Sequence, residues 1–582
     1  MHPSIAEPLK VVQALFEQAG SPVAPGSEDW GVQAHFEQLL SDPSIRAQVP
    51  CLTGSNVDMI PINGLCSYRG MVQDTLDLEM YWGAYQRECG GWATTKYSDC
   101  LGEAPAAGSS AAQPQAAARA ASKRGREVAA ADSDAEAMEL ADSVQEGIKG
   151  SEGTEASTKA SKVGGTDGGG ANGMDAPASA LPAPEEGDCL VYLYEAGERV
   201  HLNDVVEVYG VLSRVPELAQ PHLAAGAAGA GHWASDGHAQ TLLEEELAAR
   251  QPTSLVPRLH AIAVVREADG AGASESSLRA RAGELRGRAV GVLAAALGGD
   301  RFAAEYLLLQ LVSRVYTRQD TLTVGPLSVS ITGCPRSSRP PGAGEPDQAV
   351  SPLTAALQAA VAALVPRCVS LPLGVEHLNR ATWRPAREHV SNRLQRSALQ
   401  LPAHSSLLLD ETGLAAGMLT AVGIDNLKAV KGLLELKSVD YGFLVYQLPM
   451  AADVPTTILS AGTSLLANAV DVVVPLHATH APGASTAMAG DVLGEVRAWL
   501  AAVRRLNPRL DDAHVTAEIV AARSADPSLR PEQLHTWLLL ARLLAASWGE
   551  AEVTPQRWTE MRAMEAARLE RAHICVTSVK TG

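Results

Sequence analysis

Short apolar runs separated by helix-type patterns recur through the second half of the chain. Each run is five or six residues long, and all but the first lack strict alternation of apolar and polar positions; most are followed by turn residues. Strands of this kind, alternating with helices, are typical of a parallel sheet that is covered on both faces. The sequence therefore predicts an α/β domain whose strands are residues 327–332, 368–373, 405–409, 456–460 and 471–475.

Helical periodicity marks both ends of the chain. Residues 8–18 and 28–40 each gather their apolar side chains on one face. Pro531 and Pro555 stand at positions suited to a first helical turn, ahead of apolar residues at helical spacing. A helical domain over residues 479–582, following the sheet, is the order expected of an AAA+ ATPase module with its lid. Any α-helical C-terminal bundle is the alternative.

Strand patterns of a second kind lie on both sides of a long polar stretch. Residues 60–74 and 80–85 precede it, and we expect these two strands to pair; residues 189–194, 200–212 and 254–264 follow it. We therefore predict one small β-barrel of the OB type that is split by an insertion. A separate β-hairpin is predicted at 438–448, with Gly442 near its turn.

The polar stretch itself, residues 104–187, contains no aromatic residue and is dominated by Ala, Gly, Ser, Asp and Glu. Such a segment cannot bury enough apolar surface to offset the entropy of ordering, so we predict that it is disordered. Residues 219–250 suggest a further exposed insertion. The predicted organisation is mixed α+β overall, with helices and half of the barrel in 1–103, the linker in 104–187, the other half of the barrel in 188–265, the AAA+-like domain in 284–478 and the helical domain in 479–582.

A basic cluster, Lys123, Arg124 and Arg126, stands within the linker ahead of an acidic tract at 132–139. Short Lys/Arg clusters serve as nuclear-import signals. A solvated charge run in a linker is the alternative, and the sequence leaves both interpretations open.

Adjacent acids, Asp410 and Glu411, follow the third predicted strand of the α/β domain. In nucleotide-hydrolysing α/β proteins this position holds the Walker B pair, in which one acid orients Mg²⁺ and the next polarises a water. The phosphate cradle, GxxxxGK[ST], would follow the first strand. Residues 333–342 instead contain no Gly-Lys-Ser/Thr and include three prolines, which remove amide donors.

The sequence therefore predicts a nucleotide-binding architecture without the parts for hydrolysis. We expect no catalytic residue, no cofactor and no metal site, and we interpret Asp410 and Glu411 as a degenerate Walker-B-like pair at a strand end. Binding of Mg²⁺ by this pair, with nucleotide supplied by a neighbouring subunit, is the alternative.

Composition and charge narrow the classes of function. The formal charge of −19 argues against direct binding to duplex DNA, because neutralising phosphates requires a basic face. The eight cysteines include no CxxC pair, so we expect reduced thiols and no structural zinc. No signal peptide and no run of eighteen apolar residues is evident, and we expect a soluble intracellular protein without a membrane partner.

Seven stretches carry a resemblance to a known family by their order and spacing: residues 69–85, 202–213, 254–260, 303–318, 327–335, 392–412 and 439–449. They resemble the mini-chromosome maintenance (MCM) complex-binding protein family. The resemblance implies a nuclear, non-enzymatic partner of MCM helicase subunits that acts in DNA replication, in removal of MCM complexes from chromatin and in sister-chromatid cohesion, with chromatin contacted only indirectly. A single-stranded nucleic-acid-binding protein with an OB-type barrel is the alternative function.

Overall fold

The chain forms two compact units, and the boundaries between them fall within three of its strands. Unit 1 comprises Met1–Tyr68, Glu79–Glu198 and Val208–Val264, and unit 2 comprises Arg69–Leu78, Arg199–Glu207 and Val265–Gly582. No helix among the described residues is long and apolar enough to cross a membrane. The computed structural model describes residues 2–19, 29–75, 84–86, 91–98, 188–194, 200–213, 256–266, 275–319, 322–336, 351–388, 393–443, 445–482, 490–510 and 512–581.

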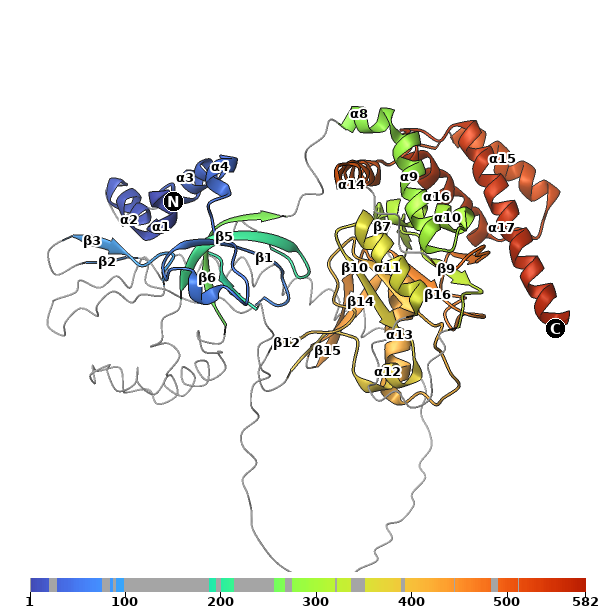
Figure 1. Cartoon of the computed structure of the whole chain (residues 1–582), viewed down its shortest axis with the longest axis horizontal. Helices are drawn as coiled ribbons and strands as arrows, with labels where there is room; N and C mark the ends of the chain where they lie inside the picture. The colour runs from blue at the N-terminus through green and yellow to red at the C-terminus, as the bar shows by residue number, and fades with distance from the viewer. Residues whose placement is uncertain are drawn as a thin grey trace, which may run out of the picture. The chain divides into compact units, whose positions relative to one another are not determined.

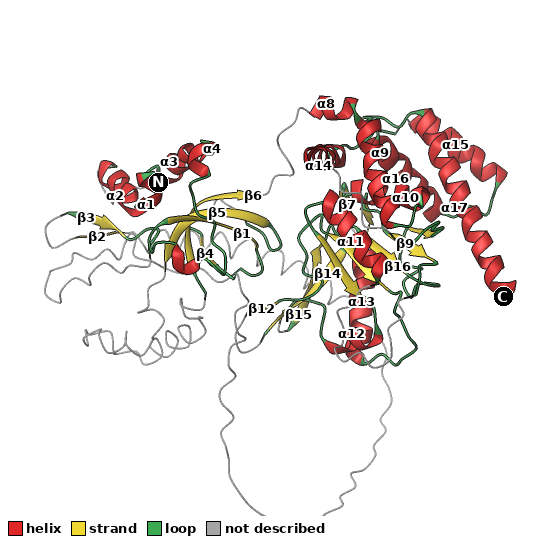
Figure 2. Cartoon of the chain, in the orientation of Figure 1, coloured by secondary structure: helices red, strands yellow, loops and turns green. Residues whose placement is uncertain are grey.

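Unit 1 combines short helices with a four-stranded sheet in the order β1-β5-β6-β4 (Figures 1 and 2). Strand β1 precedes residues 104–187 and the other three follow them, so strands from both sides of the predicted insertion join one sheet. The elements are α1 (Pro3–Ala6), α2 (Pro8–Gln18), α3 (Val32–Leu40), α4 (Pro43–Arg46), η1 (Val57–Met59), β1 (Leu65–Met71), β2 (Ala84–Gln86), β3 (Trp92–Thr94), β4 (Leu190–Tyr192), β5 (Val205–Ser213) and β6 (Arg258–Arg266).

The core of unit 1 joins the predicted helical faces to the sheet. Val12 of α2 and Phe36 of α3 are buried in one cluster with Tyr209 of β5 and Ile262 of β6. Of residues 80–85, which we expected to pair with the first strand, only 84 and 85 are described, and they lie in β2, outside the sheet that contains β1. Strand β2 pairs with the nearby β3, while β1 lies beside the nine-residue β5. A local hairpin closes a short loop, whose entropic cost is small.

Unit 2 contains a five-stranded, all-parallel sheet in the order β10-β13-β16-β9-β17. Each of the five strands predicted for the α/β domain is present in it, which confirms the mixed α/β class. The runs were sufficient for this prediction because they are short, mostly apolar and separated by helical patterns. The strands are β9 (Val329–Thr332), β10 (Cys368–Pro372), β13 (Ser406–Asp410), β16 (Thr456–Leu459) and β17 (Val472–Pro475).

Both faces of this sheet are covered, and successive residues of β13 show how. Leu408 lies in a core shared with helices α9, α10, α11, α14, α16 and α17, whereas Leu407 and Leu409 lie in a second core with α12 and α13. Side chains of a strand alternate between its two faces. The helices are α8 (Glu275–Ala280), α9 (Ala282–Ala296), α10 (Arg301–Val312), α11 (Pro352–Leu364), α12 (Val375–Arg380), α13 (Ala421–Glu435), α14 (Gly490–Arg504), α15 (Asp512–Ala525), α16 (Pro531–Ser547) and α17 (Pro555–Thr581).

A smaller sheet lies beside the second core, in the order β12-β11-β14-β15. The predicted hairpin is its β14–β15 pair, in which Gly442 lies opposite Gln447 and the chain reverses between Phe443 and Tyr446. The elements are β11 (Ala386–Arg387), β12 (Leu394–Gln395), β14 (Ser438–Phe443) and β15 (Tyr446–Ala451); a separate two-stranded sheet is formed by β7 (Thr317–Gln319) and β8 (Leu322–Val324).

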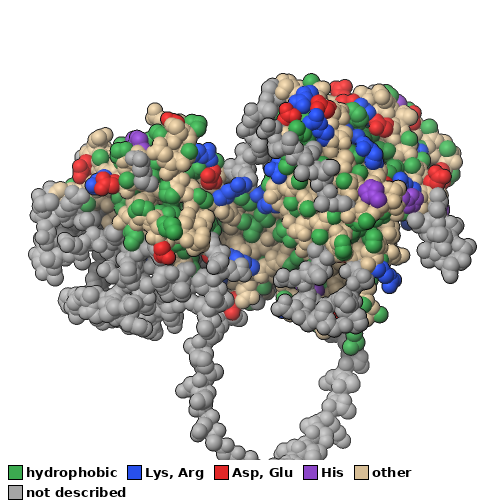
Figure 3. All heavy atoms as spheres, viewed as in Figure 1, with side chains coloured by type: hydrophobic (Ala, Val, Ile, Leu, Met, Phe, Trp, Pro, Cys, Tyr) green, Lys and Arg blue, Asp and Glu red, His purple; other side chains and the backbone are tan. Residues whose placement is uncertain are grey.

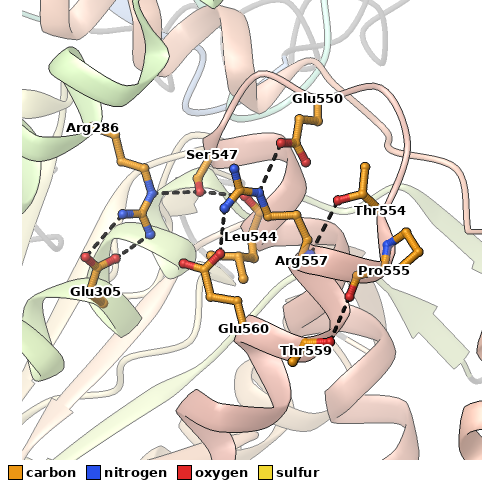
Figure 4. A network of polar contacts seen from close by, with 10 residues as sticks. All are labelled: Arg286, Glu305, Leu544, Ser547, Glu550, Thr554, Pro555, Arg557, Thr559 and Glu560. Carbon is orange, nitrogen blue, oxygen red and sulfur yellow. Dashed lines mark hydrogen bonds and ion pairs between the residues drawn. The ribbon is translucent and has the colours of Figure 1, made fainter.

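Polar contacts join the helices before the sheet to those after it (Figure 4). Arg286 of α9, only 7% exposed, donates to Glu305 of α10 and, at 3.0 Å, to the Ser547 hydroxyl of α16. Its guanidinium also lies 4.9 Å from the centre of the Trp548 ring, and Arg557 of α17 lies 4.2 Å from that same ring. The C-terminal helices are therefore held in one body with α9 and α10.

Opposite charges also meet on the surface of these helices. Arg281 forms ion pairs with Glu284 at 3.2 Å and with Glu495 at 2.9 Å, and Arg288 pairs with Glu284. Figure 3 shows positive and negative side chains gathered together over α8, α9 and α14. Exposed pairs of this kind contribute little to stability because water screens them.

Candidate functional site

Asp410, the last residue of β13, is 5% exposed, and both of its carboxylate oxygens are occupied. Oδ2 accepts hydrogen bonds from the Ser351 amide at 2.8 Å and from the Thr354 hydroxyl at 2.7 Å. Oδ1 accepts from the Thr412 amide at 2.9 Å and from its hydroxyl at 2.6 Å. The carboxylate thus receives four hydrogen bonds from protein groups.

These bonds connect Asp410 to the start of α11, the helix that follows the first strand of the sheet. Ser351 caps α11 by accepting a hydrogen bond from the Thr354 amide at 3.1 Å. Burial opposes the ionisation of Asp410, but the hydrogen bonds from Thr412, Ser351 and Thr354 favour the carboxylate more, so the pKa lies below its usual value. A stable negative charge at this helix N-terminus is also favourable to the helix dipole.

Glu411 lies in a different environment although it is the next residue. It is 4% exposed, and its Oε1 accepts one hydrogen bond from the Ser464 hydroxyl at 3.0 Å. Burial raises the pKa of Glu411 to about 7, against the opposing effects of Ser464 and the Leu465 amide, and the charge of Asp410 raises it further. Near neutral pH this carboxyl is therefore partly protonated.

This arrangement does not fit a bound Mg²⁺. Magnesium requires oxygen ligands in near-octahedral geometry and usually keeps several waters. Each oxygen of Asp410 already accepts two hydrogen bonds, and Glu411 is buried beside Ser464. The described residues also contain no group of three or more His, Cys, Asp or Glu side chains that could hold a metal ion. The geometry favours a structural role for the pair.

A second polar cluster, not anticipated from sequence, lies within unit 2 at the small sheet. Asp74 Oδ2 accepts from the Leu394 amide of β12 at 2.9 Å, and its Oδ1 accepts from Arg387 of β11 at 3.2 Å. The neighbouring Gln73 accepts from Arg396 through its side chain and, at 2.8 Å, from Gln400 through its carbonyl. Segment Arg69–Leu78 is thereby fixed to residues more than 300 positions away.

A similar bond joins segment Arg199–Glu207 to the hairpin. The Asn203 side-chain amide donates to the Tyr441 hydroxyl of β14 at 2.8 Å. Apart from Arg387, the residues in both contacts belong to stretches that carry the family resemblance: 69–85 with 392–412, and 202–213 with 439–449. Membership of these stretches was the one sequence feature that singled out the contact residues, but the sequence does not show which stretches contact each other.

The remaining predicted features are outside the part of the chain that the structure describes. This holds for the linker 104–187, for its basic cluster Lys123, Arg124 and Arg126, and for the insertion at 219–250. The described cysteines, Cys51, Cys66, Cys189, Cys334 and Cys368, are free thiols.

Comparison with known proteins gives a consistent set of relatives. The family model described as mini-chromosome maintenance replisome factor matches residues 36–109 and 102–572. A protein of Arabidopsis thaliana named mini-chromosome maintenance complex-binding protein is 29% identical over 605 residues, covering 97% of this chain and 98% of its own. Relatives of the same name from Gallus gallus and Danio rerio are 31% and 28% identical; the first alignment covers 67% of this chain and 63% of the relative, and the second covers 98% of both.

Proposed function

Because the chain belongs to the mini-chromosome maintenance (MCM) complex-binding protein family, we propose that it is a non-enzymatic regulator of DNA replication that binds MCM helicase subunits. The name shared by its relatives supports MCM binding. We assign the binding to folded surfaces rather than to the linker 104–187, whose composition offers little apolar surface for a specific interface.

The non-enzymatic part of the proposal rests on one observation, the internal bonding of Asp410. An acid that orients Mg²⁺ must present free oxygens to the ion. In this chain those oxygens accept hydrogen bonds from Ser351, Thr354 and Thr412, and a Gly-Lys-Ser/Thr motif is absent after the first strand. The same hydrogen bonds hold the carboxyl end of β13 against the start of α11 without any nucleotide.

We further propose that unit 2 is a degenerate AAA+-like module and that the sheet of unit 1 belongs to a split OB-like barrel. Numbered along the chain, the parallel strands lie in the order 2-3-4-1-5, with the fourth strand inserted between the first and the third. This order is that of AAA+ ATPase cores. It places Asp410, at the tip of the third strand, near α11, which occupies the position of the phosphate-binding helix.

A chain that shares the layout of a helicase subunit can occupy a face that another subunit would use. Binding that prefers the separated subunit draws a hexamer apart by mass action, without hydrolysis. A preference of about 3 kcal/mol shifts the balance roughly 150-fold. Removal of MCM complexes from chromatin and support of sister-chromatid cohesion would follow from this activity.

The test is dissociation of a preassembled MCM complex by the purified full chain, with and without ATP. We expect release in both conditions and tighter binding to free subunits than to the intact hexamer. Release that requires ATP hydrolysis by this chain, or tighter binding to the hexamer, would contradict competition.

We propose a nuclear location, for which Lys123, Arg124 and Arg126 are the candidate signal. The measurement is the distribution of a fluorescently tagged chain in cells, compared with a variant carrying Ala at all three positions. Cytoplasmic accumulation of the variant would support an import role. An unchanged distribution would favour the solvated charge run.

The alternative function, single-stranded nucleic-acid binding, has a direct test. A labelled oligonucleotide is titrated with the full chain over a salt series, since true phosphate contacts weaken steeply with salt. With a net charge of −19, we expect no binding at physiological salt.

A further inference from the structure

Large apolar side chains are exposed together on the hairpin β14–β15. Val445 at its turn is 92% exposed, and Tyr446 and Leu448 on the outer strand are 59% and 44% exposed. Isolated exposed apolar residues are ordinary on protein surfaces. Three of them within four positions of one hairpin form a patch, and patches mark interaction sites.

The strand register holds this patch in a fixed arrangement. Phe443 and Tyr446 are directly paired across the hairpin, and their rings stack with centres 5.3 Å apart at 20°. The guanidinium of Arg387, from the adjacent β11, lies 5.8 Å from the centre of the Phe443 ring. A partner would therefore meet a pre-organised aromatic surface, which lowers the entropic cost of binding.

Strand β15 is at the edge of its sheet, and its Pro449 favours contact with a partner through side chains rather than through the strand's backbone. Ala452 donates to the Lys437 carbonyl at 2.9 Å, and hydrogen-bonded and non-bonded pairs alternate in an antiparallel ladder. The Asp440–Pro449 pair is therefore non-bonded, and the nitrogen of Pro449 faces the open edge. Since proline has no N–H, addition of a partner strand along this edge is disfavoured.

Positive charge accompanies the patch although the chain as a whole is acidic. Residues 380–396 contain five arginines and one glutamate, a local balance of +4 in a chain of −19. Arg384 donates to Gln447 of β15 at 3.3 Å, which places it beside the hairpin.

We infer that Val445, Tyr446 and Leu448, together with Arg384, form a docking surface for an acidic protein segment that carries apolar side chains. The inference rests on the proposed function, because it takes the segment to belong to an MCM subunit. Aliphatic Val445 and Leu448 suit apolar side chains rather than stacked bases, and the net charge of the chain repels nucleic acid.

The experiment measures binding of the full-length chain to each purified MCM subunit by fluorescence anisotropy. The first variant combines Tyr446→Ser with Leu448→Ser, and the second is Arg384→Gln. Val520→Ser on α15 is the matched control, since Val520 is 58% exposed in the same unit. We expect the first variant to bind at least tenfold more weakly, the second to bind more weakly with a reduced dependence on salt, and the control to bind like the wild type.

Each outcome distinguishes the inference from the function on which it rests. Unchanged thermal unfolding of the variants, measured alongside, assigns a binding loss to the surface. Wild-type binding that both variants retain would overturn the inference and leave the proposed function standing. Failure of the wild type to bind any MCM subunit would overturn both. Binding of a thirty-residue oligothymidylate that the first variant loses would identify nucleic acid as the occupant and overturn the inference.

Discussion

The Thr354 hydroxyl at the start of α11 donates to Asp410 Oδ2 at the end of β13, at 2.7 Å, and the two groups satisfy each other inside the protein. In an ATPase these positions face Mg²⁺ and phosphate. Here the hydrogen bond joins a helix to a strand, so Thr354 and Asp410 have a structural role.

Asp410→Asn should destabilise unit 2. Asparagine offers one acceptor oxygen and an amide group to a site that presents four donors, so at least one buried donor loses its partner, at a cost of about 1–3 kcal/mol. Because the pKa of Asp410 is lowered in the folded chain, its contribution is present above its unfolded pKa and is lost as pH falls through the folded value. Urea unfolding at pH 7 measures the loss. The control is Asp425→Asn, at an exposed pair with Lys428, which should change stability little.

Glu411→Gln should stabilise unit 2 at neutral and higher pH, in contrast to Asp410→Asn. The unfolded chain releases the Glu411 proton near 4.5 and the folded chain near 7, so wild-type stability falls as pH rises between these values. Glutamine keeps the acceptor for Ser464 and carries no charge. We expect equal stability near pH 4.5 and a variant more stable by up to about 3 kcal/mol at pH 8. The control is Glu435→Gln, at an exposed pair with Lys431 on α13, which should change stability little.

Purified full chain should hydrolyse MgATP no faster than background. The reason is the occupied carboxylate of Asp410 and the missing Gly-Lys-Ser/Thr sequence. Phosphate release is measured for the wild type and for a variant combining Asp410→Asn with Glu411→Gln. Wild-type turnover that disappears in this variant would show that the pair is catalytic.

Asp74→Ala should loosen segment Arg69–Leu78 from the small sheet. The substitution leaves the Leu394 amide and Arg387 without their carboxylate acceptor, with an expected cost of about 1–3 kcal/mol. We expect the Leu394 amide, which loses its acceptor, to exchange its hydrogen faster in the variant, and hydrogen exchange at this amide is the measurement. Asp440→Ala, on the exposed side of β14, is the matched control. Unchanged exchange in Asp74→Ala would show that the contact contributes little in solution.

Removal of residues 104–187 should affect neither folding nor MCM binding. Their composition supplies no apolar surface for a core. The shortened chain is compared with one in which a Gly/Ser segment of equal length replaces the linker. A melting temperature lowered by many degrees, or loss of MCM association in both chains, would contradict the prediction.

The sequence by itself determined the elements whose stabilising pattern is local. The five parallel strands are short, mostly apolar runs, and α16 and α17 begin at Pro531 and Pro555, where proline suits the first helical turn. The Asp410–Glu411 pair was also located correctly, at the end of β13, because a change from apolar to charged residues ends a buried strand.

Only the tertiary structure decided which distant groups meet. The partners of Asp410, Ser351 and Thr354, precede it by 59 and 56 residues, and Asp74 and Leu394 are 320 residues apart. Strand β2 pairs with β3 rather than β1, although the pattern of each strand fits either partner. The residue that supplies a hydrogen-bond donor or a strand edge does not indicate in the sequence which distant residue it will pair with. The choice depends on the free energy of the whole packed arrangement, which is also why two adjacent acids, Asp410 and Glu411, have pKa values shifted in opposite directions.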